Sequence, residues 1–274
     1  MIKLKHCALL GAIVLAPHTR ADSALEYLLT EPHADTAKAQ PVLVKDGQVL
    51  IKGAGGDANL DLLYTRAQER VIVIDHRHRT LMALDERQFD RLAQQAETFQ
   101  PLLQGLGEQL GKLTPEQRGK WEQMLGGKVD LGQLAGAAQL PKALNVVNTG
   151  VGKQVAGIAC QQINVVENKK TRAEFCLADP NRLSLSGDDY ATLRSLLGLS
   201  ERLAAKGRGL AGRFGIKIPA IALNQLEGVP IEMQDLSKDK MGTLTLNRVS
   251  STAVDEALMR VPNGYRNKEL DFLK

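Results

Sequence analysis

The sequence lacks most of the features that point directly to a function. Aromatic residues make up only 4% of its 274 residues, and its basic residues form no dense block, so a nucleic-acid surface built on stacking is not expected. No apolar run approaches the roughly 20 residues of a transmembrane helix. The GxSxG and HExxH motifs of hydrolases and metalloproteases are also missing. What remains is a soluble globular protein without an obvious catalytic signature.

The N-terminus has the parts of a secretory signal peptide. Two lysines precede an uncharged apolar run from Cys7 to Ala16, and Thr19-Arg20-Ala21 follows. We predict cleavage after Ala21 and export to the periplasm. A lipoprotein would need a cysteine just after the run, whereas Cys7 lies at its start. Loss of residues 1–21 removes three basic residues and no acid, which lowers the formal net charge from +4 to +1.

The first third of residues 22–274 has the pattern of β-strands. Asp46-Gly47 divides the apolar-rich stretch 42–53, and this dipeptide is typical of a type I′ hairpin turn. Three further strands are expected at 59–65, 70–75 and 80–85. The turns between them are too short for crossover helices, so the segment predicts an antiparallel meander.

A helical insertion of about 86–148 follows. Apolar residues spaced by three or four predict one helical face, with Pro101 as a kink or a new start. The candidate apolar face contains Leu92, Phe99, Leu103, Leu106 and Leu110. Thr114 and Gln117 have the spacing of a capping box for the next helix. The insertion either covers the sheet and closes the core, or serves as a lid over an apolar cavity or a surface for a partner.

Strands are expected again from the stretch 160–176, and Ser186-Gly187-Asp188-Asp189 predicts the start of another helix. Glycines at 207, 209, 212 and 215 are expected to end this helix. The stretches 228–236 and 241–250 supply a closing pair of strands. Since no repeat or low-complexity linker interrupts the chain, we predict one α+β domain over residues 22–274.

The two cysteines that remain after export bracket a hairpin. If its turn centres on Asn168, Cys160 lies directly opposite Cys176 and Gln162 opposite Glu174, with one largely apolar face. A zinc site would need more ligands, and a redox motif would have two residues between the cysteines. We therefore predict a structural disulfide in an oxidising compartment, contributing about 3 kcal/mol.

Other candidate sites have simpler explanations. Asp75-His76-Arg77-His78 places two histidines on alternate positions, but further metal ligands are not evident, and we interpret it as a polar turn. The stretch 207–212 matches GxGxxG but follows a helix instead of a strand. The stretch 53–56 lacks the Lys-Ser/Thr of a phosphate loop and is interpreted as a flexible connection. No metal and no cofactor is expected.

Three stretches carry a resemblance to a known family. They are VAGIAC at 155–160, the cysteine before Leu177-Ala178-Asp179, and VPNGY at 261–265. With the strand meander and the insert, they resemble the bacterial domain of unknown function DUF4412 over roughly 42–265. The resemblance implies a fold similar to LolA-type periplasmic lipoprotein carriers: a curved antiparallel sheet, or unclosed barrel, with helices on its concave side and an apolar cavity that accepts acyl chains. It implies no catalytic or binding residues.

The sequence thus leads to two hypotheses. The first is a periplasmic, non-enzymatic binding or carrier protein that shelters an apolar ligand, a lipid or a lipoprotein acyl chain, between sheet and helical plug. The alternative is an envelope interaction or assembly protein with a filled core, which contacts another protein through its insertion. An enzyme is the less favoured class, because the sequence shows no catalytic motif. It stays an alternative because many active sites carry no local motif.

Overall fold

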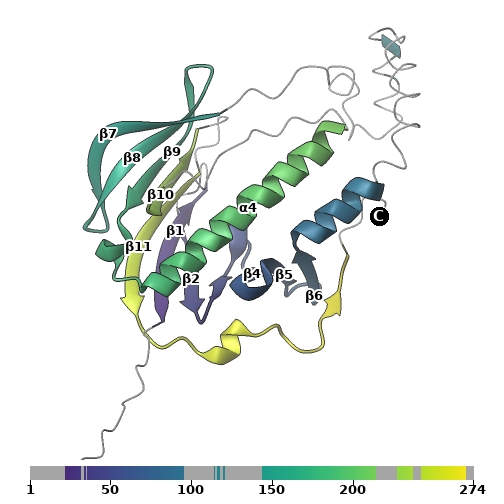
Figure 1. Ribbon diagram of the computed structural model, residues 1–274, viewed down its shortest axis with the longest axis horizontal. Coiled ribbons are helices and arrows are strands. Elements are labelled where there is room, and N and C mark those ends of the chain that lie inside the picture. The colour runs from purple at the N-terminus through teal and green to yellow at the C-terminus, as the bar shows by residue number, and fades with distance from the viewer. Residues whose placement is uncertain are drawn as a thin grey trace, which may run out of the picture.

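The computed structural model describes residues 22–31, 34, 36–95, 114, 116–117, 120, 144–213, 227–236 and 242–269. Within these residues the chain forms one large sheet, a long helix α4 (Gly187–Arg213) and a helical segment over 86–95 (Figure 1). In this described part, no helix has the length and apolar character of a membrane span.

The sheet has twelve strands in the order β12-β6-β5-β4-β3-β2-β1-β11-β10-β9-β8-β7. The first group is β1 (Ser23–Thr30), β2 (Lys38–Lys45), β3 (Gln48–Ile51), β4 (Leu60–Thr65), β5 (Arg70–Asp75) and β6 (Thr80–Leu84). The second is β7 (Asn145–Val155), β8 (Ile158–Glu167), β9 (Lys170–Ala178), β10 (Val229–Asp235) and β11 (Thr243–Ser251), and the two-residue β12 (Arg266–Asn267) returns to β6. The sheet is therefore two meanders that meet where β1 pairs with β11.

The predicted meander of the first group is confirmed. The β2–β3 turn has positive φ at both central residues, 46° at Asp46 and 75° at Gly47, as a type I′ turn requires. Strands β4, β5 and β6 follow within a residue of the expected limits. Local turn chemistry and period-two patterning suffice to define strands β2 to β6.

Three strands were not predicted. The stretch at Ser23–Thr30 forms β1, whose alternating buried positions include Leu25 and Tyr27. Strand β7 begins at Asn145, so residues 145–148 belong to the sheet and not to the helical insertion. Strand β12 pairs with β6 in parallel, which makes the sheet mostly rather than wholly antiparallel.

Different segments cover the two faces of the sheet. Helix α4 and the segment 86–95 lie on one face, which holds the larger core, including Leu25, Val44 and Leu199 (Figure 1). A C-terminal strap, residues 252–268, crosses the opposite face and buries Met259 against a second core. The fold is thus an α+β arrangement in which a single sheet is packed on both sides.

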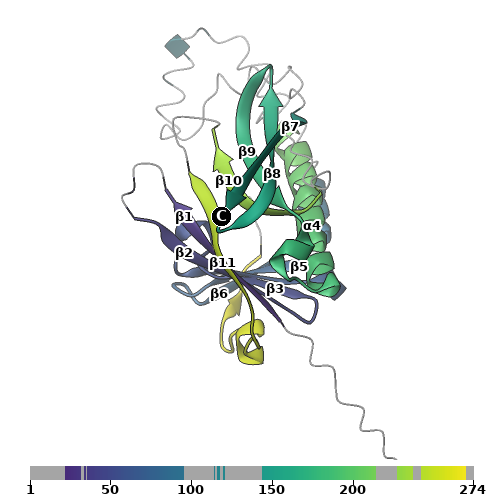
Figure 2. The same cartoon turned by 90° about the vertical axis from the view of Figure 1, so that its left-hand side faces the viewer.

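The second meander curls strongly, and its two outer strands approach each other (Figure 2). Lys153 of β7 forms an ion pair with Glu232 of β10, although β8 and β9 lie between these strands. Flat neighbouring strands are about 4.8 Å apart, so such a pair across two intervening strands requires a curved sheet. The sheet remains open, with β12 and β7 at its edges.

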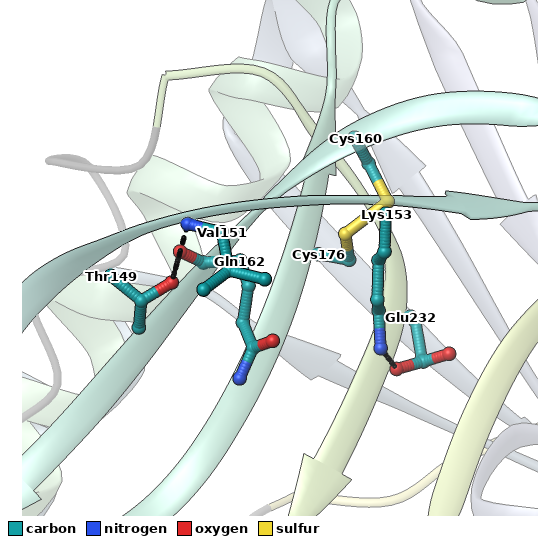
Figure 3. Close-up of a disulfide and its surroundings, with 7 residues drawn as sticks. All are labelled: Thr149, Val151, Lys153, Cys160, Gln162, Cys176 and Glu232. Atoms are coloured by element: carbon teal, nitrogen blue, oxygen red, sulfur yellow. Dashed lines mark hydrogen bonds and ion pairs between the residues drawn. A yellow bond between two sulfur atoms is a disulfide. The ribbon is translucent and has the colours of Figure 1, made fainter.

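Beside this ion pair, Cys160 and Cys176 are joined, with an S–S distance of 2.10 Å and Cα atoms 5.5 Å apart (Figure 3). The predicted register is wrong by two residues, because Cys176 lies opposite Gln162. The turn consists of Asn168 and Lys169, both with positive φ, and Arg172 is an extra residue in β9. A shift of two preserves the side-chain face, so the cysteines become diagonal neighbours that still meet.

Helix α4 begins as predicted, with the Ser186 hydroxyl accepting a hydrogen bond of 3.0 Å from the Asp189 amide. It continues through Gly207, Gly209 and Gly212 to Arg213, so these three glycines do not end it as expected, and Gly215 lies outside the described residues. A Cβ atom at Gly207 would lie 3.5 Å from the ring of Phe89. Gly207 therefore lies where the segment 86–95 packs on α4, a tertiary contact that local sequence cannot reveal.

Candidate binding cavities

An apolar cavity of about 150 Å³ lies between α4 and the sheet. Its lining combines the first meander, α4 and the closing strands: Leu25, Tyr27, Gln40, Val42, Ile51, Tyr190, Leu193, Arg194, Leu196, Leu197, Gly228, Val229, Pro230, Met233 and Leu244. Alternation along β1 and β2 aims every second side chain at this face. On α4, Leu193, Leu196 and Leu197 recur at three- and four-residue spacing, which places them on one stripe.

Tyr27 is the most deeply buried polar group in the lining. Its hydroxyl donates a hydrogen bond of 3.0 Å to the carbonyl oxygen of Pro230, which ties β1 to β10. Burial raises the pKa of Tyr27 well above its ordinary value. The side chain therefore stays neutral and offers a ring to the cavity while its polar end is satisfied.

Helix α4 is fixed over the cavity by two hydrogen bonds to the sheet. Near its first turn, Asp189 accepts a bond of 2.6 Å from the Ser23 hydroxyl of β1, and both residues are buried. Less than two turns later, Ser195 and Tyr64 of β4 are joined by a hydrogen bond of 2.7 Å. These contacts set the distance between helix and sheet, and so the height of the cavity.

The start of the helical insertion packs against α4. Phe89 joins the core and Leu92 is only 3% exposed, while Glu86 forms an ion pair with Arg202 of α4. For these residues the covering interpretation is correct. The other members of the candidate apolar face, Phe99, Leu103, Leu106 and Leu110, lie outside the described residues. The predicted capping box is confirmed, since Thr114 and Gln117 exchange hydrogen bonds.

A larger and more polar groove, of about 550 Å³, lies beside the end of β3. Its floor comes from the sheet and the β3–β4 connection, and one wall comes from the strap: Leu29, Lys38, Ala39, Gln40, Pro41, Leu50, Lys52, Gly53, Gly56, Ala58, Asp61, Ile74, His76, Ala257, Leu258, Arg260 and Pro262. The stretch 53–56 is not a loose connection, because it forms a short 3-10 turn whose Gly53 amide donates to Asp61.

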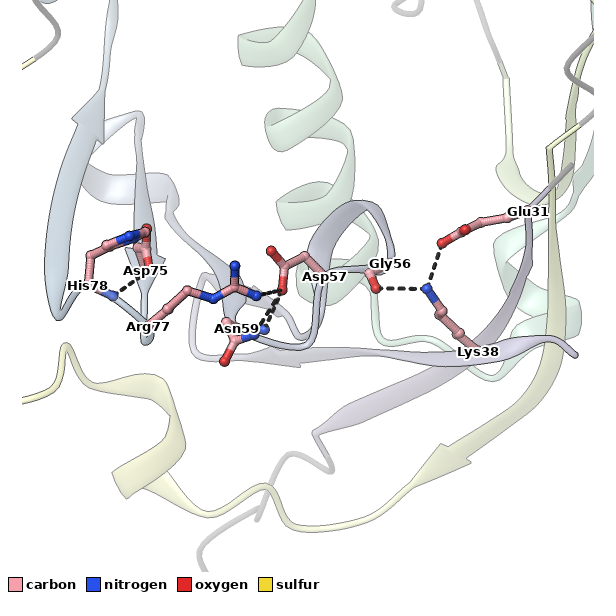
Figure 4. A network of polar contacts seen from close by, with 8 residues as sticks. All are labelled: Glu31, Lys38, Gly56, Asp57, Asn59, Asp75, Arg77 and His78. Atoms are coloured by element: carbon pink, nitrogen blue, oxygen red, sulfur yellow. Dashed lines mark hydrogen bonds and ion pairs between the residues drawn. The ribbon is translucent and has the colours of Figure 1, made fainter. Parts of the chain in front are cut away.

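Two of the three cations in the groove lining have partners. Lys38 donates to Glu31 at 2.7 Å and to the Gly56 carbonyl at 3.3 Å (Figure 4), and Arg260 pairs with Glu256 one helical turn away. Lys52 is half-buried and makes no ion pair or side-chain hydrogen bond with any described residue. Among the described residues, Lys52 is thus the lining ammonium group without an acidic partner.

His76 fastens the strap to the sheet beside this groove. Its Nε2 lies 3.0 Å from the Asp61 carboxylate and its Nδ1 lies 2.9 Å from the Tyr265 hydroxyl. Since a carboxylate only accepts, Nε2 donates to Asp61, while Nδ1 forms the hydrogen bond to the Tyr265 hydroxyl. Both ring nitrogens are engaged, so His76 acts as a structural clasp.

The second histidine of the stretch 75–78 has a different partner. Asp75 accepts hydrogen bonds from the His78 amide and from its ring, at 2.9 and 2.7 Å (Figure 4). The amide bond first, and then the ring bond, hold the pKa of Asp75 below its ordinary value. Over the residues described, no three His, Cys, Asp or Glu side chains are placed to hold a metal ion. The GxGxxG match at 207–212 lies within α4.

Comparison with known proteins adds little. No family model and no curated protein matches the chain. Among solved structures, an uncharacterized conserved protein from Thermus thermophilus aligns with a TM-score of 0.41 and 8% identity, covering 91% of each chain. PNGF-II aligns with a TM-score of 0.38 and 10% identity, over 92% of this chain and 31% of its own. At these TM-scores neither likeness bears on function.

Proposed function

We propose that this is a non-enzymatic periplasmic binding or carrier protein that shelters the apolar part of a ligand, an acyl chain, between the sheet and α4. The observation that carries the proposal is the apolar cavity at this position. Of its described lining residues, only Tyr27, Gln40, Tyr190 and Arg194 have polar side-chain atoms. Such a lining binds by burial and sets little specificity of its own.

The predicted signal peptide and the joined cysteines support a periplasmic location, because disulfides persist in oxidising compartments. The open, mostly antiparallel sheet with a helix against one face supports the resemblance to DUF4412 and to LolA-type carriers. The proposal therefore includes a periplasmic location and membership of the DUF4412 family.

The cavity volume limits what the site accepts as it stands. An apolar cavity of about 150 Å³ accommodates a group the size of benzene, and whole ligands usually occupy about 300 Å³ or more. The cavity therefore fits the end of one chain. Each methylene that enters should add about 0.8 kcal/mol, or about fourfold in affinity, until the cavity is full.

A chain-length series tests the proposal directly. Titration calorimetry with uncharged alkanols of increasing length should give affinities that rise about fourfold per carbon and level off near roughly six carbons. Mass spectrometry of protein purified under native conditions from a bacterial envelope should also find an acyl compound bound. If no alkanol binds and no lipid is retained, the proposal is wrong.

Two neighbouring positions on β2 provide a matched pair of variants. Val42 lines the cavity, whereas Leu43 packs on the opposite face against the second core. Val42→Phe should lower alkanol affinity by about fifteenfold or more, because the ring takes the space of at least two methylenes. Leu43→Phe adds similar bulk outside the cavity and should leave the affinity unchanged. Equal effects of both variants would indicate a general loss of stability.

The envelope-interaction alternative makes a different prediction. Crosslinking in cells should then capture a defined partner through residues 86–148, and alkanols should not bind. The burial of Leu92 and the packing of Phe89 commit the first turns of that segment to the core, which favours the carrier function.

A further inference from the structure

The uncompensated ammonium of Lys52 points to a ligand group that the apolar cavity does not explain. Lys52 lines the larger groove and is half-buried, yet no described carboxylate lies within ion-pair distance of it. The other lining cations, Lys38 and Arg260, have their own acids. A partly buried ammonium without a partner loses hydration without gaining an ion pair, and an anionic ligand would compensate for this loss.

The groove and the apolar cavity adjoin where β3 ends. Strand β3 stops at Ile51, opposite Val42 of β2, and the Lys52 amide then donates to the Pro41 carbonyl before the chain leaves the sheet. The end of β2 beyond Pro41 consequently pairs with β1 on one side only. The result is a notch in the sheet, and Gln40 beside it lines both spaces.

Adjacent residues at the notch line different spaces. Val42 and Ile51 line the apolar cavity, while their neighbours Pro41 and Lys52 line the groove. A ligand whose acyl chain lies under α4 and extends past Gln40 would therefore reach from an apolar environment to the ammonium group of Lys52. The groove has ample room for a head group, since its volume is more than three times that of the cavity.

We propose that the ligand is a single-chain carboxylate, whose tail lies under α4 and whose carboxylate binds Lys52 in the groove. This inference rests on the proposed carrier function and adds the chemical class of the ligand. Within the described lining, Lys52 is the one ammonium without an acidic partner and matches one negative charge, whereas a doubly charged phosphate would require a second such cation. The Gln40 side-chain amide lies at the junction of the two spaces and can donate a second hydrogen bond to the bound carboxylate.

The experiment compares three ligands with the same ten-carbon chain: decanoate, decanol and decyltrimethylammonium. Dissociation constants are measured by calorimetry at neutral pH and low ionic strength. The wild-type protein should bind decanoate roughly tenfold more tightly than decanol, and decyltrimethylammonium less tightly than either. The advantage of decanoate should shrink as salt is added, because the groove is open to solvent.

Variants of Lys52 assign this preference to the groove. Lys52→Gln should bring decanoate to the affinity of decanol and leave decanol unchanged, and Lys52→Arg should retain the preference. Lys170→Gln removes the same charge from the exposed start of β9, far along the sheet, and should behave as the wild type. Denaturation midpoints show whether each variant is folded.

The outcomes separate the two proposals. If decanol binds under α4 but decanoate has no advantage, or if Lys52→Gln keeps that advantage, the carboxylate assignment is wrong and the carrier function stands. If none of the three ligands binds to the wild-type protein, both are wrong.

Discussion

Ser23 Oγ donates a 2.6 Å hydrogen bond to Asp189 Oδ2, and so joins the first strand of the sheet to the first turn of α4. The two residues are 166 positions apart in sequence and both are buried. In a buried environment such a charge-assisted bond is strong and also directional. It fixes the helix end next to the apolar cavity, where a small displacement would change the space available to a ligand.

Replacement of Ser23 should therefore be costly. Ser23→Ala leaves a buried carboxylate oxygen without its donor, and we expect the free energy of unfolding to fall by about 1–3 kcal/mol in urea denaturation. Ser251 is the register partner of Ser23 on β11 but is exposed, so Ser251→Ala should change stability by less than about 0.5 kcal/mol. Equal losses in the two variants would argue against a specific role of the bond.

The cysteine pair should stabilise the folded chain and have no catalytic role. Mass mapping without reductant should recover Cys160 linked to Cys176. Reductant should lower the free energy of unfolding of the wild-type protein by roughly 3 kcal/mol, as expected for a loop of this length. A double Cys160→Ala/Cys176→Ala variant should be insensitive to reductant. Two free thiols in exported protein would contradict both the pairing and the proposed compartment.

Acid should weaken the β5–β6 turn through Asp75. The folded-state pKa of Asp75 lies below that of the unfolded chain, so its contribution is present above about pH 4 and disappears as the pH falls through the folded value. Asp75→Asn should therefore show a shallower loss of unfolding free energy below about pH 4 than the wild type. Denaturant titrations at a series of pH values measure this slope. Parallel curves for the two proteins would refute the assignment.

Gly228 should not tolerate a side chain. Its φ is 116°, and a Cβ atom there would lie 2.7 Å from the carbonyl oxygen of Ala178 on the neighbouring strand. We expect Gly228→Ala to destabilise the protein by about 1–3 kcal/mol, through both backbone strain and this contact. Gly187, at the start of α4, has open space around its Cβ position, so thermal denaturation of Gly187→Ala should show little change.

Sequence patterns predict the parts of this fold that depend on neighbouring residues. Asp46-Gly47 specifies the β2–β3 turn, and Thr114 and Gln117 specify a helix cap. In both cases the interacting groups lie within a few positions of each other in sequence. Strand β1 was also detectable, since Leu25, Tyr27 and Leu29 alternate, but a short apolar run beside a signal peptide is ambiguous.

The remaining features depend on distant segments. Arg172 is an extra residue in β9 whose carbonyl accepts a hydrogen bond from the Leu236 amide, a partner more than 60 residues away. The β8–β9 register therefore cannot be deduced from the hairpin alone. Likewise, the groove around Lys52 exists only because the strap brings Leu258 and Arg260 against the sheet. Leu92, the described member of the candidate apolar face, lines neither cavity, and the other four members lie outside the described residues.

The pairing of β1 with β11 also bears on the timing of folding. If the chain is exported from its N-terminus, β1 reaches the far side of the membrane first and β11 only after about nine-tenths of the chain has crossed. Until then the two meanders remain separate, and β1 is an unprotected edge at what will become the middle of the sheet. A chain built in this way stays incomplete throughout translocation, and it depends on its surroundings to keep that edge from pairing with another molecule.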